Sequence, residues 1–176
     1  MKIIFPILLA SALAIPAFAQ DAKTNAAPEQ TSNSVSLAVV TLPASAGMVS
    51  APLFLTNGSI SQPEQTELAG GGKAVYEFII TNPGNYLITA QVNAAGEDAN
   101  SFFVNVDAAP EDPLMIWDIE VTSEFEERTV SWRGNRTDST DEFAPKKFNL
   151  SAGAHKLNLV GREPVQLKSI SIRQAN

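Results

Sequence analysis

The residues best suited to chemistry in this sequence surround its second tryptophan. Trp132 is followed at once by Arg133 and, after one glycine, by Asn135, in a polar stretch typical of a loop. An exposed indole offers a flat apolar face, and guanidinium and amide groups beside it can hydrogen-bond to pairs of hydroxyls. This combination of residue types is what a sugar ring requires, so the pattern predicts a carbohydrate site at this loop. Asn100 is expected to contribute from across the same loop face.

Each of these residues also has a purely structural interpretation. Alternation within 114–119 puts Trp117, the other tryptophan, on one face with Met115 and Ile119, which favours the core of a sheet over a ligand platform. Trp117 is kept as a fifth candidate ligand-binding residue beside this alternative. Trp132 is balanced between core and platform, and Arg133 and Asn135 could equally be solvated loop residues.

Groups able to catalyse a reaction are present, but not in a catalytic pattern. The carboxylates gather in two runs, at 124–127 and 138–142, that are typical of solvated loops. Glycoside hydrolysis instead needs two carboxyls facing each other across a cleft. The chain has one histidine, His155, no cysteine and no Gly-x-Ser-x-Gly motif. We therefore expect no enzyme activity, no cofactor and no metal site, and we expect His155 to be a core-edge residue hydrogen-bonded to backbone.

The first 19 residues have the features of an export signal. Lys2 is followed by an apolar run to Ile15 and by Ala17-Phe18-Ala19, the small-x-small form that signal peptidases cut. The run is shorter than the roughly 20 residues of a membrane span, and two prolines flank or interrupt it. Residues 20–34 are polar and aperiodic, as in a flexible leader. We expect a secreted or periplasmic protein with one folded domain at 35–176 and no membrane span.

Composition narrows the possible partners. The chain has 12 Lys and Arg against 19 Asp and Glu, a net charge of −7; without the signal and its Lys2 the balance is 11 against 19, or −8. An acidic chain without a basic cluster is a poor candidate for binding nucleic acid or anionic membranes.

Short strands separated by turn signals fill the chain from Val35 onward. Alternation turns Tyr76, Phe78 and Ile80 to one face, and it turns Phe102 inward and Asn105 outward. No window of a dozen residues after the signal keeps a helical period. The sequence predicts an all-β, two-sheet antiparallel β-sandwich, most simply a jelly roll. Ten strands are expected: 35–42, 48–56, 74–81, 85–92, 101–107, 114–119, 128–133, 146–150, 155–160 and 166–173.

Four segments in this order resemble one family of jelly rolls. They are 74–86, which contains Pro83-Gly84-Asn85-Tyr86; Asn100–Asp107; the two tryptophans; and 148–163, which ends in Gly161-Arg162-Glu163. Over some 125 residues the chain resembles the galactose-binding-like modules, including carbohydrate-binding modules of families six and thirty-five. The resemblance implies the jelly roll and a binding function, and it implies a structural ion pair for the Arg162-Glu163 motif.

The chain also departs from that family. The family has a Glu on its first strand and an Asp after its final Leu, and such acids help to hold a structural calcium. Here the first position falls in Ala44–Gly47, and Lys168 follows Leu167. Calcium needs several oxygen ligands, so we expect the usual site to be lost. The family cleft also has an aromatic residue in the loop before the strand at 74–81, and Glu67–Gly70 offers none.

The sequence therefore predicts an exported, non-catalytic module that binds a poly- or oligosaccharide, with an acidic polysaccharide among the options. The alternative is an envelope or extracellular structural module that contacts another protein and has no sugar site. The exposure of Trp132 discriminates between the two.

Overall fold

The computed structural model describes residues 39–135 and 143–175. The predicted export signal and leader, the start of the first predicted strand and the whole of the second carboxylate run lie outside these residues. The described residues include two 3-10 turns, η1 (Ala44–Ala46) and η2 (Arg133–Asn135). The strands are β1 (Val39–Pro43), β2 (Met48–Ser50), β3 (Phe54–Thr56), β4 (Ser59–Ser61), β5 (Lys73–Ile80), β6 (Gly84–Asn93), β7 (Ser101–Val106), β8 (Ile116–Asp118), β9 (Glu126–Thr129), β10 (Phe148–Leu150), β11 (Gly153–Gly161) and β12 (Gln166–Gln174).

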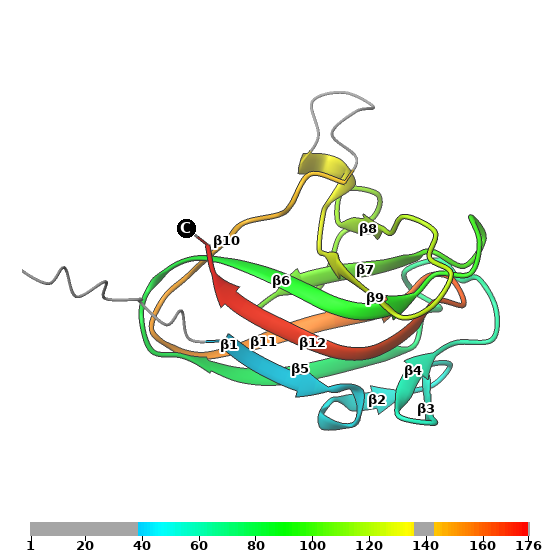
Figure 1. Cartoon of the computed structure of the whole chain (residues 1–176), viewed down its shortest axis with the longest axis horizontal. Coiled ribbons are helices and arrows are strands. Elements are labelled where there is room, and N and C mark those ends of the chain that lie inside the picture. The colour runs from blue at the N-terminus through cyan, green and yellow to red at the C-terminus, as the bar shows by residue number, and fades with distance from the viewer. Residues whose placement is uncertain (1–38, 136–142, 176) are drawn as a thin grey trace, which may run out of the picture. The chain divides into compact units, whose positions relative to one another are not determined.

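The strands form two antiparallel sheets, which confirms the predicted β-sandwich (Figure 1). Sheet A has the order β10-β6-β12-β4-β3, with β1 also paired to β12 and β9 also paired to β6. Sheet B has the order β2-β5-β11-β7-β8. The long strands β6 and β12 pair at the centre of sheet A, and β5 and β11 pair at the centre of sheet B. Within the described residues, no helix is long and apolar enough to cross a membrane.

The core lies between the sheets and follows the predicted alternation. Tyr76, Phe78 and Ile80 on β5 are all buried, as are Leu157 and Leu159 on β11. Burial of these large apolar side chains on both inner faces is the main favourable term in the free energy of folding.

Strand β7 departs from the prediction because both of its faces are buried. Asn105 was expected to face solvent, yet it is only 8% exposed. The segment after β7 folds back over it, and the Asn105 amide donates a 3.2 Å hydrogen bond to the carbonyl of Ala109. Beside it, Phe103 packs with Ile116 and Val160 in a small second cluster. The outer face of sheet B is thus partly covered at β7. The alternation rule fails there because it assumes that the outer face of a sheet is open to solvent.

The predicted single strand 48–56 is wrong. It is two short strands, β2 and β3, that join different sheets, and β4 was not predicted at all. Asn57 and Gly58 connect β3 to β4 with φ angles of 48° and 78°. Positive φ at two successive residues is typical of a type I′ hairpin turn, for which Asn-Gly is the preferred pair.

Candidate functional site

A groove lies between one edge of each sheet, at β8 and β9. Its volume is about 280 Å³. We call it the β8–β9 groove, and its lining residues are Trp117, Asp118, Ile119, Glu120, Glu127, Arg128, Thr129, Phe143 and Pro145. In Figure 1, η2 lies next to β8 at the same end of the molecule. The predicted loop site and this groove are therefore neighbours.

Arg133 is joined to the groove wall by a two-pronged ion pair. Its Nε lies 2.6 Å from Oδ2 of Asp118, and its Nη2 lies 2.7 Å from Oδ1. Asp118 is 7% exposed, whereas the side chain of Arg133 is 31% exposed. A bidentate guanidinium–carboxylate pair fixes both planes. Arg133 therefore positions Asp118, which lines the groove, and two of its N–H donors are bonded within the protein.

Trp132 is half-buried against the core, with several interactions already made. Its indole Nε1 donates a 2.9 Å hydrogen bond to the carbonyl of Val104, and its ring meets the Phe148 ring edge-on. The ammonium of Lys146 lies 4.1 Å from the ring centroid, a cation–π contact. Trp132 does not line the β8–β9 groove. Its predicted role as a stacking platform stays a prediction, with a strong structural role beside it.

The remaining predicted residues separate in the structure. Trp117 is 1% exposed and packs against Phe102 in the core, as its alternative interpretation expected, although it also lines the groove; its contact with a ligand stays a prediction. Asn100 accepts a hydrogen bond from the backbone N–H of Ile119 through its own carbonyl, beside the groove, but its side-chain amide is directed to Glu97. Asn135 ends η2, and its side chain lies outside the described part of the structure.

Phe143 is the aromatic residue of this region that the sequence analysis missed. It lines the groove and is 45% exposed. It follows a run of polar and acidic residues, so the loop pattern obscured it. A single aromatic residue directly after a run of polar and acidic residues is the sequence signal that could have identified it.

The groove is rich in carboxylates. Asp118, Glu120 and Glu127 line it against one cation, Arg128, so these four residues carry three negative charges and one positive charge. Arg128 Nη2 lies 2.8 Å from Glu126, and its Nε lies 3.6 Å from Glu120. The groove thus offers several acceptors and an arginine held in place, an arrangement suited to hydroxyl groups.

The Arg162-Glu163 motif is an intramolecular structural site, as predicted. The two side chains form an ion pair, and Ser101 Oγ donates a 2.7 Å hydrogen bond to Glu163. Arg162 donates in turn to Ser101 Oγ, and the backbone N–H of Asn100 donates to Glu163. Since Glu163 is 5% exposed, these hydrogen bonds satisfy a buried charge that would otherwise be costly.

His155 is buried and hydrogen-bonded to the backbone carbonyl of Ser151, which confirms its predicted place at the core edge. Its Nδ1 also lies 2.7 Å from Oδ2 of Asp107, a partner that was not predicted. Burial works against a charge on His155, but its hydrogen bonds to Asp107 and Ser151 and the negative charge of Asp107 raise its pKa overall. The ring also stacks on Phe78.

The two positions where the family resemblance implied acidic calcium ligands have other roles in this chain. Ala44 is fully buried in η1, and its carbonyl accepts a 3.1 Å hydrogen bond from the hydroxyl of Tyr76. Burial raises the pKa of Tyr76 to about 12. Lys168 extends its ammonium to 5.7 Å from the ring centroid of Phe125. At these two positions, where the sequence has no acidic residue, Ala44 packs in the core and Lys168 makes a cation–π contact.

Comparison with solved structures identifies the fold. A family 35 carbohydrate-binding module from Clostridium thermocellum matches with a TM-score of 0.56 and 11% identity, over 78% of this chain and 99% of that one. The C-terminal CBM6 of a marine laminarinase from Zobellia galactanivorans matches with a TM-score of 0.53 and 18% identity, over 78% and 100%. In the Podospora anserina GH26-CBM35 mannanase, the TM-score is 0.54 and the identity is 14%, over 78% of this chain but 28% of the enzyme.

These matches define the fold of the protein first as a jelly-roll β-sandwich. More narrowly, its fold is that of the family 6 and family 35 carbohydrate-binding modules. No family model and no curated protein matches the sequence.

Proposed function

We propose that this protein is a non-catalytic carbohydrate-binding module whose ligand occupies the β8–β9 groove. The observation that carries the proposal is a half-exposed aromatic ring, Phe143, beside a groove lined by Asp118, Glu120, Glu127 and Arg128. A flat apolar face together with convergent acceptors and a fixed guanidinium is the combination that a sugar ring needs. The full-length fold match to two carbohydrate-binding modules supports the same class of ligand.

The stacking residue in this proposal is Phe143, and Trp132 has a structural role against Phe148. The one polar group of Trp132, its indole N–H, is bonded to Val104, and the ammonium of Lys146 lies over its ring. Arg133 acts as a positioning residue through Asp118, and Asn100 and Asn135 remain candidates for outer contacts. A shallow open groove of this size predicts weak binding, in the micromolar to millimolar range, or roughly −4 to −8 kcal/mol.

The charge of the groove favours a neutral sugar over an acidic one. A uronate carboxylate would meet two carboxylates, Glu120 and Glu127, against one arginine, Arg128, because Asp118 and Arg133 neutralise each other. Repulsion between a uronate carboxylate and the carboxylates that line the groove opposes binding. We therefore propose neutral oligosaccharides as the ligand class, acting outside the cytoplasm as the export signal suggests.

The test is affinity electrophoresis of the mature protein against a panel of neutral and uronate polysaccharides, followed by calorimetry with oligosaccharides of any that bind. Binding to a neutral polysaccharide is expected, and Phe143→Ala is expected to weaken it roughly 5- to 150-fold, by analogy with the stacking of a nucleic-acid base on one aromatic ring, which is worth about 1–3 kcal/mol.

Phe54→Ala is the matched control, because Phe54 is equally exposed, at 46%, and lies on β3 away from the groove. Both variants should unfold at the wild-type temperature. Equal loss of affinity in both variants, or a panel that is silent throughout, would overturn the proposal and favour the alternative of a structural or protein-contact module.

A further inference from the structure

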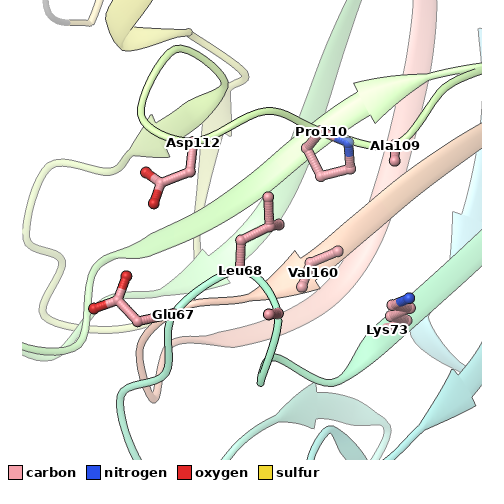
Figure 2. A pocket seen from close by; sticks show the side chains of 8 residues that line it. Glu67, Leu68, Lys73, Ala109, Pro110, Asp112 and Val160 are labelled. Carbon is pink, nitrogen blue, oxygen red and sulfur yellow. The ribbon is translucent and has the colours of Figure 1, made fainter.

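A second, larger cavity lies on the outer surface of sheet B, with a volume of about 480 Å³ (Figure 2). It opens between the segment before β5 and the segment after β7. Leu68, Pro110 and Val160 form its apolar part, and we call it the sheet B groove. Val160 belongs to the small cluster with Phe103 and Ile116, outside the main core. The sheet B groove shares no lining residue with the β8–β9 groove.

Its lining does not suit a sugar. The segment before β5 supplies Glu67, Leu68 and Ala69, and none of the described residues that line the groove is aromatic. The apolar floor would gain free energy from an apolar ligand, at about 25 cal/mol for each Å² removed from water. Its volume is within the range of about 300–1,000 Å³ that is common for small-molecule sites.

The charged residues at the rim are arranged asymmetrically. Figure 2 shows the carboxylates of Glu67 and Asp112 at one end and Lys73 at the other, with Leu68 and Val160 between them. Among the described residues, neither carboxylate has a hydrogen-bond or ion-pair partner. Two unpaired carboxylates against one ammonium, on a chain of net charge −7, favour a positively charged group.

We propose that the sheet B groove binds a small organic cation, namely an apolar body that carries one positively charged amine. The apolar body lies over Leu68, Pro110 and Val160, and the amine lies between the carboxylates of Glu67 and Asp112. Lys73 repels a second positive charge at the far end, so the site selects ligands with a single charged head.

The test uses three probes with the same octyl chain, namely octyltrimethylammonium, octanoate and octyl glucoside, each kept below its micelle concentration. Backbone amide shifts of the ¹⁵N-labelled mature protein report both affinity and location. We expect octyltrimethylammonium to bind saturably with shifts at Leu68, Ala69 and Ala109. We also expect octanoate to bind at least tenfold more weakly, because it lacks the pairing with two carboxylates.

Three variants test the two parts of the site. The double variant Glu67→Gln/Asp112→Asn should lose about tenfold in affinity for the cation, whereas Glu97→Gln/Glu124→Gln, with the same change in net charge elsewhere, should not. Ala109→Trp fills the groove from an exposed position and should abolish binding of all three probes at these amides. Circular dichroism and the unfolding temperature check that each variant is folded.

Several outcomes would overturn the inference. Octanoate binding as tightly as the cation would make Lys73 the dominant group, and octyl glucoside binding equally would mean that charge has no part. Shifts that survive in Ala109→Trp would put the probe elsewhere. Failure here leaves the sugar proposal untouched, because that proposal is read out at other residues.

Discussion

Arg133 and Asp118 are joined by two hydrogen bonds of 2.6 and 2.7 Å, from one η2 side chain to one β8 side chain. A residue whose type and place suggested direct contact with a ligand is thus an anchor for the wall of the β8–β9 groove. Its partner is nearly buried, so the ion pair links the stability of the loop to the shape of the groove.

This ion pair predicts strong energetic coupling. Arg133→Met leaves the carboxylate of Asp118 buried without this partner and should lower the free energy of unfolding by about 2 kcal/mol. In the cycle with Asp118→Asn, urea denaturation should give a coupling energy of about 1–2 kcal/mol. A coupling energy near zero would mean that the pair does not hold the loop.

Trp132 is predicted to contribute mainly to the free energy of unfolding. Trp132→Ala removes the contact with Phe148 and the hydrogen bond to Val104, and should cost about 3 kcal/mol, near the lower end for large aromatic truncations because the ring is only half-buried. Trp132→Phe keeps the packing and should cost about 1 kcal/mol. Wild-type stability in Trp132→Ala would instead support a free platform.

The His155–Asp107 pair predicts a stability maximum in mildly acidic solution. Protonated His155, with its pKa raised above 6.5, stabilises the fold below that pH, and this contribution is lost as pH rises through its folded-state pKa. Burial opposes the charge of Asp107, but hydrogen bonds from His155 and the Lys156 N–H lower its pKa below 3.8 overall. Its contribution is therefore present above 3.8 and is lost as pH falls through its folded-state pKa.

We expect the free energy of unfolding, followed by urea denaturation, to be highest between about pH 3.8 and 6.5 as far as this pair contributes. Asp107→Asn should flatten the decline above this window, whereas Asp98→Asn, at an exposed position, should leave it as in wild type. An unchanged decline in Asp107→Asn would assign the pH dependence to other groups.

The β3–β4 turn predicts that substitution of Gly58 and of Gly70 by alanine will change the stability of the fold to different extents. Gly58→Ala forces a side chain into φ 78° and should destabilise the fold by about 1 kcal/mol. Gly70→Ala meets no atom closer than 3.8 Å and should have almost no effect. Equal unfolding temperatures for the two variants would argue against the type I′ turn.

Much of the fold could be predicted from local patterns. The alternation of apolar and polar residues on β5 and β11 predicts correctly which side chains face the core, because the main core lies on only one side of these strands. The same rule failed for Asn105 because the segment that follows its strand folds back and covers the second face. The β3–β4 hairpin carried its signal in Asn57-Gly58, which was overlooked inside a longer apolar run.

The candidate site was less predictable, since it depends on which side chains pair across elements. The types of Trp132 and Arg133 suggested a ligand, but their partners, Val104 and Asp118, lie 28 and 15 residues away in the sequence. Phe143 became a candidate only because it lines the same groove as residues of β8 and β9. A sequence indicates which groups are present, and tertiary packing decides which of them remain available.

The most direct test of the central claim is an amide-shift titration of the mature protein with a neutral oligosaccharide chosen from the polysaccharide panel. We predict saturable shifts at Asp118, Glu120, Glu127 and Thr129, with none at Leu68 or Ala109. Saturable binding with shifts confined to other residues, or no shift at millimolar sugar, would contradict the assignment of the β8–β9 groove as a carbohydrate site.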